Sequence, residues 1–467
     1  MMMLPNTIQE LSKHAAQEFI QTAVFVDDRI YERSSAKSSE GPSKLITPKP
    51  RRKAIKNVSV GAKTNVTPPE IAEEDSSPDS YDIVTSFAKK QIICCLYQPK
   101  SKAKVSPTSD IFPLCKSADV VILDWDLFGD KGKRALELVD GLVAQAVQDV
   151  PEQLRLILVY TQETNLFSVA NELYEKVHAS IGDEFQPLEG GLTFHTSNSR
   201  ITVLGKPGRE RADTNPEHIV HEKDIADAAV IEFAKLASGL LQAATLLGLS
   251  EIRKNSRKIL SKFNTSLDPA FITHMAMCLP DEDASSHVTP LLVSEIESVL
   301  EDVLPSPLIS SKLLADWCNN VWKPGAHLSR IFNNANVDYK SVAIEICSKG
   351  FKQAAKDNSL VPNINKSGSK HVNKAAKIFL PNDASEANHS FSQLMASRTF
   401  YGNGKRTLQL GCIVRNQVNG HYLLCIQPVC DSVRLKDARS FIFVKMSEIS
   451  TVADSTPSHF VASQGTA

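Results

Sequence analysis

The stretch Val120-Val121-Ile122-Leu123-Asp124 decides the fold class, because four consecutive apolar residues end there in a carboxylate. A continuous apolar run rich in β-branched residues is typical of a central parallel strand that is covered on both faces. Further short apolar runs lie at 23–26, 92–97, 154–160 and 201–204. The sequence therefore predicts a sheet of mostly parallel strands.

Segments with helical spacing of apolar residues separate these strands. They are expected at 7–21, 81–91, 110–116, 133–147 and 165–181. Strands that alternate with helices imply right-handed crossovers and an α/β doubly wound parallel sheet. Ligands of such sheets bind beyond the carboxyl ends of the strands.

The pattern changes after Pro216, where helices replace the alternation. One long helix is predicted at 217–247, followed by helices at 252–263, 288–300, 309–322 and 339–357, and by strands at 408–414, 422–426 and 441–445. Asn419-Gly420, between the first two of these strands, is a strong hairpin signal. The sequence thus predicts four parts. They are the sheet domain at 1–33 and 81–215, an inserted linker at 34–80, a mostly helical domain at 216–380, and an α+β region with a small β-hairpin element at 381–467.

The insertion at 34–80 is rich in Ser, Pro, Lys and Thr and poor in large apolar residues. Such a composition cannot bury enough surface to offset chain entropy, so disorder is expected. Its basic half, 49–56, also fits a nuclear-import or nucleic-acid patch. We favour the solvated linker.

The charge balance excludes two classes of protein. The chain has 467 residues with 52 Lys+Arg against 53 Asp+Glu, for a formal net charge of -1. It is neither basic throughout nor an acidic solvating protein, so nucleic acid is not an expected partner. Nine cysteines without a CxxC pair fit a reducing, cytoplasmic location. No signal peptide is expected, and no apolar stretch reaches the roughly 20 residues of a membrane span.

Polar residues follow the predicted strands where each one ends. They are Asp27 and Asp28, then Asp124, then Thr161, then Lys206 before Pro207. Because parallel strand ends share one edge, these side chains are expected to converge. Clustered carboxylates suit a hard divalent cation, most simply Mg²⁺. A carboxylate beside Mg²⁺ can accept a phosphoryl group and form an aspartyl phosphate.

These residues, in this order and strand context, resemble the receiver domain of two-component response regulators over about residues 20–245. The resemblance implies the flavodoxin-like strand order of that family and a histidine kinase as phosphodonor. It implies that Asp124 is the phosphoacceptor and that Thr161 and Lys206 contact the phosphoryl group. Asp126 lies two residues later and competes for the nucleophile role. We favour Asp124, because it directly follows the apolar run.

The same resemblance implies a set of Mg²⁺ ligands. Asp28 would bind the metal directly, Asp27 directly or through water, and Asp124 through its carboxylate. The backbone carbonyl of Asp126 would complete the protein ligands.

The chain departs from the receiver pattern in two places. The stretch 202–205 before Lys206 lacks the aromatic residue usual in the family, which puts a Thr–aromatic switch in doubt. Gln162 and Glu163 stand where the family prefers a small residue after Thr161. Together with Asp126 they could restrict attacking water, so we hypothesise a long-lived phosphoryl group. A degenerate receiver kept as a binding scaffold is the alternative.

No familiar output module is evident after residue 216. The architecture resembles the receiver-bearing component of Detocs-type phage-defence systems, which implies a phosphate sink, buffer or adaptor sharing its kinase with a second response regulator. The chain is then a phosphoacceptor with at most slow self-dephosphorylation rather than an enzyme. The predicted helix from Glu217 could form a homodimer or pack within its own domain. A DNA-binding or effector-enzyme C-terminal half remains the alternative.

Three weaker features favour structural roles. Cys412, His421, Cys425 and Cys430 match no common zinc spacing. The pair Cys430-Asp431 suggests a nucleophile only by proximity. His14, within the first predicted helix, fits an ordinary surface residue better than a phosphodonor.

Overall fold

The computed structural model describes residues 5–31, 78–148, 154–188, 190–208, 211, 216–277, 280–303, 309–332, 337–362, 374–380, 386–396, 408, 410–428 and 440–446. The chain divides into two compact units. We call Ser12–Ser238 the α/β unit, and Met1–Leu11 together with Gly239–Ala467 the helical unit. Most of the predicted linker at 34–80 lies outside the described residues.

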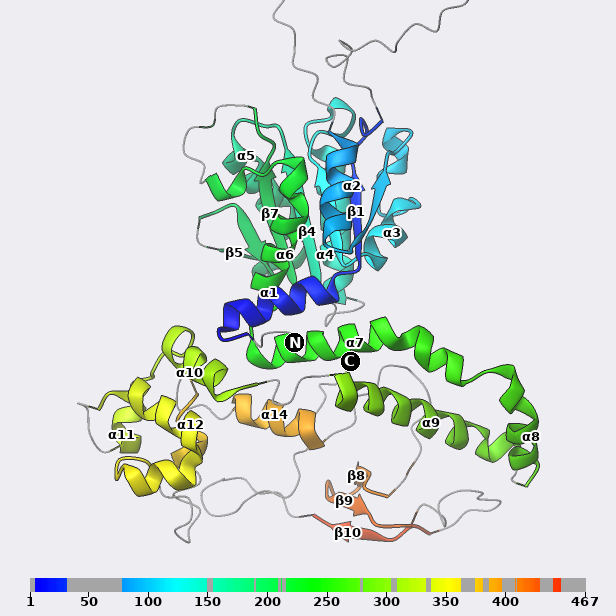
Figure 1. Ribbon diagram of the computed structural model, residues 1–467, viewed down its shortest axis with the longest axis vertical. Helices are drawn as coiled ribbons and strands as arrows, with labels where there is room; N and C mark the ends of the chain where they lie inside the picture. Colours follow the sequence, from blue (N-terminus) through cyan, green and yellow to red (C-terminus); the bar gives the residue numbers. More distant parts are fainter. Residues whose placement is uncertain are drawn as a thin grey trace, which may run out of the picture. The chain divides into compact units, whose positions relative to one another are not determined.

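A sheet forms the centre of the α/β unit (Figure 1). It has seven strands in the order β2-β1-β3-β4-β7-β6-β5. The strands are β1 Thr22–Val26, β2 Ile93–Tyr97, β3 Val120–Asp124, β4 Arg155–Thr161, β5 Gln186–Pro187, β6 Thr193–His195 and β7 Ser199–Gly205. β2, β1, β3, β4 and β7 pair in parallel, and β6 is antiparallel to both β7 and β5. The predicted doubly wound sheet with flavodoxin-like order is confirmed, and the β5–β6 hairpin extends it at one edge.

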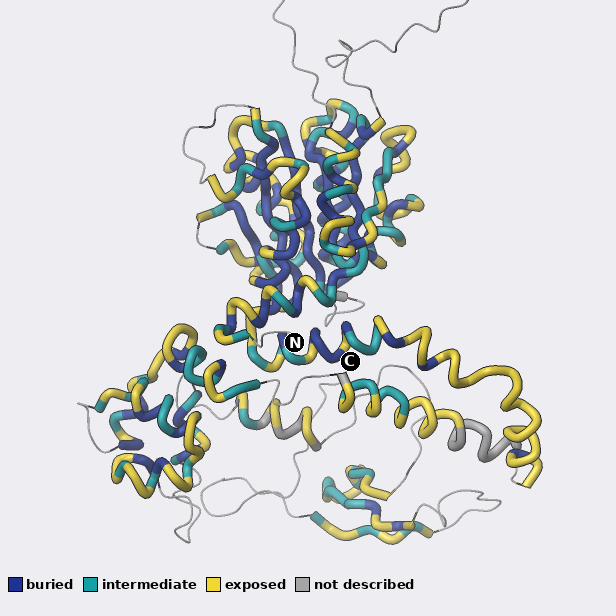
Figure 2. The backbone as a smooth tube through the Cα atoms, in the orientation of Figure 1, coloured by how far each residue is buried: buried dark blue, intermediate teal, exposed yellow. Residues whose placement is uncertain are grey.

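Helices cover both faces of this sheet. They are α2 Ser80–Lys89, α3 Ile111–Ser117, α4 Lys133–Gln148, α5 Leu166–Ile181 and α6 Ile225–Leu236. The first helix, α1 Ile8–Phe19, precedes β1, and its Phe19 ring stacks on Phe233 of α6. Val121 and Leu123 of β3 and Ile157 of β4 join a buried cluster with α3, α4 and α5. Because side chains alternate along a strand, the residues between them face the other side, where α6 packs on β4 and β7. Figure 2 shows the strands as the most continuously buried part of the unit.

Local capping explains where several helices begin. Asp79 accepts hydrogen bonds from the backbone N–H groups of Tyr81 and Asp82 at the start of α2. Asn165 does the same for Ser168 at the start of α5, at 3.0 Å. Such caps satisfy donors that have no partner inside the helix.

The prediction of a single long helix at 217–247 is wrong. The chain there forms two short 3₁₀ turns, Pro216–His218 and Glu222–Asp224, before α6, and α7 spans Leu240–Lys262 after a break. The break falls at Ser238 and Gly239, residue types that weaken a helix interior. Phe233 and other apolar residues of α6 are buried in the α/β unit. A homodimer through a helix from Glu217 therefore has no continuous helix to use.

The helical unit contains, among its described residues, α7, α8 Asp268–Ala276, α9 Pro280–Val303, α10 Ser311–Asn320, α11 Leu328–Phe332, α12 Tyr339–Asp357 and α14 Glu386–Ala396. α7 packs along α9, and α10 packs along α12. Trp322, Phe332 and Ile346 belong to the buried cluster of this unit. Within the described ranges, no helix combines the length and apolarity that a membrane crossing requires.

A small antiparallel sheet with the order β10-β9-β8 completes the helical unit. Its strands are β8 Ile413–Arg415, β9 Tyr422–Cys425 and β10 Phe443–Lys445. β8 pairs with β9 across the Asn419-Gly420 turn, as predicted, and Gly420 has a φ of +73°. β8 begins later than the predicted 408, because Gly411 adopts a φ of +85° that interrupts an extended strand.

Candidate functional site

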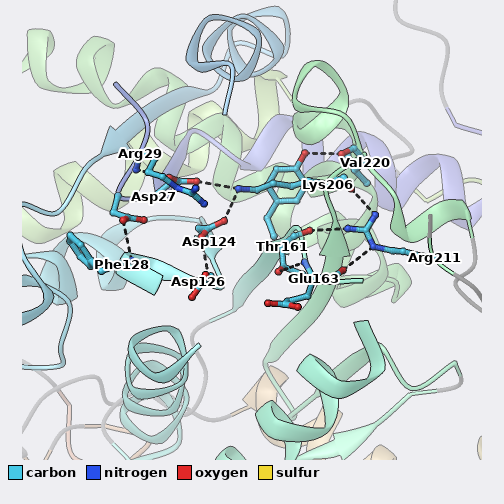
Figure 3. A network of polar contacts seen from close by, with 12 residues as sticks. Asp27, Arg29, Asp124, Asp126, Phe128, Thr161, Glu163, Lys206, Arg211 and Val220 are labelled. Atoms are coloured by element: carbon cyan, nitrogen blue, oxygen red, sulfur yellow. Dashed lines mark hydrogen bonds and ion pairs between the residues drawn. The ribbon is translucent and has the colours of Figure 1, made fainter. Parts of the chain in front are cut away.

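The carboxyl ends of four parallel strands bring the sequence-predicted site residues to one edge of the sheet. Asp27 follows β1, Asp124 ends β3, Thr161 ends β4 and Lys206 follows β7. The strand register sets Asp124 beside Tyr160 on β4, and Thr161 beside Gly205 on β7. Residues far apart in the sequence thus form one polar network (Figure 3).

Lys206 joins two carboxylates at the centre of this network. Its Nζ donates to Asp124 Oδ1 at 2.6 Å and to Asp27 Oδ2 at 3.2 Å. The three side chains are only 1–4 % exposed. Two buried carboxylates share one ammonium, so the group carries a net charge of about -1 when all three are ionised. A buried excess of negative charge favours a further cation or a proton.

The pKa shifts follow from this arrangement. Burial raises the pKa of the Asp124 carboxyl, and the nearby Asp27 carboxylate adds to the rise while Lys206 opposes it. Burial acts to lower the pKa of Lys206, but the carboxylates of Asp124 and Asp27 raise it overall. Lys206 is therefore held as an ammonium, and the charge of Asp124 depends on which cations lie beside it.

Asp28 has one oxygen bound and one without a partner. Its Oδ2 accepts a hydrogen bond from the Phe128 N–H at 3.0 Å, whereas its Oδ1 is buried and accepts none. Burial raises the pKa of Asp28, although the Phe128 N–H opposes the rise. Phe128 has a φ of +60°, which an L-residue adopts at a cost, so the loop after β3 is shaped to present this N–H. A buried oxygen without a partner can still accept a hydrogen bond or coordinate a cation.

The loop after β3 separates the roles of Asp124 and Asp126. The Asp126 N–H donates to Asp124 Oδ2 at 3.0 Å, and the Asp126 carboxylate accepts from the Lys131 N–H at 2.8 Å. The Asp126 carbonyl accepts a long hydrogen bond of 3.4 Å from the Gly129 N–H. Asp126 is half-buried and is used to fold its own loop, whereas Asp124 contacts Lys206. Of these two carboxylates, Asp124 is therefore the one that lies in the polar network with Lys206.

The donor set suits Mg²⁺ in its chemistry. Asp27, Asp28 and Asp124 supply carboxylate oxygens, and the Asp126 carbonyl supplies a fourth oxygen, which are the ligand types that Mg²⁺ prefers. The unpartnered Asp28 Oδ1 and the net negative charge fit a cation. Among the described residues, however, no three His, Cys, Asp or Glu side chains already stand close enough together to hold a metal.

Thr161 lies at the end of β4 and is 1 % exposed. Its Oγ1 accepts a hydrogen bond from the Glu163 N–H at 3.0 Å, and its carbonyl accepts one from the Lys206 N–H at 2.7 Å. Because the Oγ1 acts as an acceptor there, the hydroxyl hydrogen can be donated elsewhere. The backbone bond also ties the position of Lys206 to that of Thr161.

Two residues that sequence reasoning missed belong to the network. Lys206 Nζ lies 5.3 Å from the centre of the Tyr160 ring. Arg211 donates to the carbonyls of Glu163, Lys206 and Thr161 at 3.0, 2.7 and 3.4 Å. Tyr160 could have been recognised as a site residue from the sequence, because it lies inside an apolar strand and directly before Thr161. The sequence around Arg211 carries no such signal.

The weaker sequence candidates lie elsewhere. His14 is on α1, with Glu18 3.9 Å from its ring nitrogen. Cys425 is buried and Cys412 half-buried on the small sheet, while His421 is exposed. Cys430 and Asp431 lie outside the described residues.

Comparison with known proteins identifies the α/β unit. Residues 19–211 match the family model described as the response receiver domain. Neither the curated proteins nor the solved structures contain a match to this chain. The match covers the strands and loops that carry Asp27, Asp124, Thr161 and Lys206.

Proposed function

We propose that this chain works in two-component signalling and that its α/β unit, of which residues 19–211 match the response receiver domain, takes a phosphoryl group from a histidine kinase onto Asp124. The observation that carries the proposal is the buried contact of Lys206 with both Asp124 and Asp27. An ammonium held at the nucleophile by two carboxylates can also neutralise the oxygens of an incoming phosphoryl group. Apart from Asp124 and Asp27, no carboxylate among the described residues combines this burial with a bound ammonium at a strand end.

In the proposed reaction, a carboxylate oxygen of Asp124 attacks the phosphorus of a phosphohistidine. The new O–P bond forms as the P–N bond breaks, and the imidazole leaves with the electron pair and takes up a proton. Lys206 and the Thr161 hydroxyl contact the phosphoryl oxygens. Asp27, Asp28, Asp124 and the Asp126 carbonyl would hold Mg²⁺, which supplies charge neutralisation when bound.

Raised pKa values at Asp124 and Asp28 support the need for that cation. Attack requires the ionised carboxylate, and burial disfavours ionisation of both groups. A divalent cation beside them would restore the charged form. The same reasoning predicts that phosphoryl transfer requires Mg²⁺.

We extend the proposal to a phosphate sink, buffer or adaptor in the cytoplasm, related in role to Detocs-type phage defence. A second response regulator would then share the kinase. Gln162 and Glu163 follow Thr161 at the edge where the phosphoryl group would lie, which supports a slowly hydrolysed phosphoryl group. Under this proposal the chain is a phosphoacceptor rather than an enzyme with its own substrate.

A binding scaffold is the second candidate function. It is favoured by the finding that no described group of acidic side chains is already arranged to hold a metal. Lys206 would then serve only to neutralise Asp27 and Asp124.

Labelling with acetyl phosphate and Mg²⁺, read by intact mass, separates the two candidates. We expect the wild type and Asp126→Asn to gain the mass of one phosphoryl group, and Asp124→Asn to gain none. Asp126→Asn is the matched control, because it changes the neighbouring carboxylate only two residues away. A wild type that stays unlabelled with both acetyl phosphate and purified histidine kinase would support the scaffold. Equal labelling of Asp124→Asn would refute Asp124 as the acceptor.

A further inference from the structure

We propose that Tyr160 passes the charge state of Asp124, through the Lys206 ammonium, to the segment that leads into α6. This inference rests on the proposed phosphorylation of Asp124. It assigns a positioning role to a residue that does not touch the phosphoryl group. Tyr160 makes two sets of contacts, one at each end of its side chain.

At one end, the Lys206 ammonium lies between negative charge and an aromatic ring. The carboxylates of Asp124 and Asp27 bind Nζ at 2.6 and 3.2 Å, and the Tyr160 ring centre is 5.3 Å away. A cation is attracted to the face of an aromatic ring, more strongly where water is excluded. A phosphoryl group on Asp124 would place new charged oxygens beside Nζ and so change how the ammonium is shared between the carboxylates and the ring.

At the other end, the Tyr160 hydroxyl donates to the Val220 carbonyl at 2.7 Å. Tyr160 is fully buried, so no water replaces this bond when the ring moves. Burial also raises the pKa of the phenol, which keeps it protonated and able to donate. A displacement of the ring must therefore either move Val220 or leave a buried carbonyl unpaired.

The Val220 segment is fastened to the same strand ends that carry the site. The Val220 N–H donates to the Gly205 carbonyl at 3.0 Å, and Ile219 pairs with Gly205 as a parallel bridge. A Cβ on Gly205 would lie 2.8 Å from Ile219 Cδ1 and 3.0 Å from Arg211 Cζ. Glycine thus permits the close approach of this segment to β7, directly before Lys206.

Val220 leads within a few residues into α6. The turn Glu222–Asp224 connects it to Ile225, the first residue of α6. The Ala226 N–H donates to Ser86 Oγ on α2 at 3.1 Å. The start of α6 is thus bound to α2 and joined to the turn that follows Val220. A shift at Val220 would therefore act on the first residues of α6, which are held to α2 by this bond. The hydrogen-exchange rates of the Val220 and Ala226 amides should change first.

Hydrogen exchange of the full chain tests this inference, with beryllium fluoride and Mg²⁺ as the phosphoryl analogue. In the wild type we expect the analogue to change the exchange rates of the Val220 and Ala226 amides. Tyr160→Phe keeps the ring and removes only the hydroxyl, so the analogue should no longer change these rates. Without the analogue, the Val220 amide of this variant should exchange about five-fold faster, because loss of the hydrogen bond from the Tyr160 hydroxyl to the Val220 carbonyl makes local opening of this segment easier.

Tyr174→Phe is the matched control, since Tyr174 lies on α5 and stacks on Phe185 and Phe194. It should respond to the analogue like the wild type. Labelling of Asp124 by acetyl phosphate should stay within about two-fold of wild type in Tyr174→Phe, which changes no residue of the polar network. In Tyr160→Phe the labelling is measured in parallel, to show that a lost response to the analogue does not come from loss of the phosphoacceptor.

The outcomes distinguish this inference from the proposed function. If Asp124 is labelled but Tyr160→Phe responds to the analogue like the wild type, the role of Tyr160 is refuted and the phosphoacceptor stands. If the wild type is never labelled, the proposed function itself fails. If Tyr160→Phe fails to fold, the inference can still be tested on the wild type by NMR. The ring resonances of Tyr160 must shift when the analogue binds, and unchanged resonances would refute the inference.

Discussion

Replacing Lys206 by methionine should destabilise the α/β unit strongly, because methionine keeps the length of the side chain and removes its charge. In the wild type, Nζ lies 2.6 Å from Asp124 Oδ1 and 3.2 Å from Asp27 Oδ2. At an effective dielectric constant of about 20, these distances correspond to gross attractions of about 6 and about 5 kcal/mol. The cost of burying the three charges offsets much of this attraction.

What remains after the substitution is two buried carboxylates that have lost the ammonium they share, with the positive charge of Arg29 still acting on Asp124. Removal of one partner from a buried ion pair typically costs about 3–5 kcal/mol, and we expect Lys206→Met to fall in that range at neutral pH. The double variant Asp124→Asn/Lys206→Met should recover more than half of the loss, since only one carboxylate is then unpaired. The loss for Lys206→Met should also shrink as the pH is lowered, because protonation neutralises the carboxylates.

Native-state hydrogen exchange of β3 and β7 in the full chain measures this effect on the α/β unit alone. The free energy of opening is compared among the wild type, Lys206→Met and the double variant. A Lys206→Met protein within about 0.5 kcal/mol of wild type would refute the reasoning, since that is the range of substitutions at ordinary surface positions. A double variant no more stable than the single one would show that the carboxylates are not the cause.

Three further predictions concern the surroundings of the site. Glu232→Gln should destabilise the unit by about 3 kcal/mol, because the Glu232 carboxylate accepts from Arg200 Nε at 2.7 Å, Thr202 Oγ1 at 2.9 Å and Lys235 Nζ at 2.7 Å. Burial acts to raise the pKa of Glu232, but Arg200 and Lys235 hold it below its ordinary 4.5. Urea unfolding should therefore show the stability difference between wild type and Glu232→Gln above pH 4.5, and the difference should disappear as the pH falls below that value. Asp227→Asn, which breaks the partly exposed pair with Lys90, is the control and should change stability by less than about 1 kcal/mol. Gly132→Ala should destabilise by about 1–3 kcal/mol and slow acetyl phosphate labelling, because its Cβ would lie 2.1 Å from the Trp125 ring at a φ of +84°. The alanine at Gly129, where no atom lies within 4 Å of the added Cβ, should have the smaller effect, and equal effects would contradict the steric argument. Gln162→Ala should speed dephosphorylation of Asp124 if Gln162 restricts attacking water, and an unchanged rate by intact mass would count against that role.

The parallel strands of the α/β unit could be predicted because each is a short apolar run whose direction is set by the intervening helix. The strands β3 and β4 fall within one residue of their predicted positions. The hairpin β5–β6 was missed because β5 has 2 residues and β6 has 3, too few for a periodic pattern. Gly190-Gly191 before an apolar stretch was the available signal.

The path after Pro216 could not be predicted from periodicity alone. Apolar residues continue at helical spacing through Ser238 and Gly239, so the pattern does not mark the break. Tertiary contacts decide it, because α6 packs on β4 and β7 and ends at Leu236. Likewise, the sequence places Lys206 at a strand end, but its contact with both carboxylates and with the Tyr160 ring depends on the register of four strands, β1, β3, β4 and β7.

The packing of Trp125 on Gly132 gives the chain a built-in optical probe of its own chemistry. Trp125 is 2 % exposed and lies between Asp124 and Asp126, so its indole emission should respond when the loop accommodates a phosphoryl group or a cation. The chain has three tryptophans, and the other two, Trp317 and Trp322, belong to the helical unit. Replacing those two by phenylalanine would leave a single fluorophore one residue from the proposed acceptor, so that occupancy of Asp124 could be followed in real time without an attached dye.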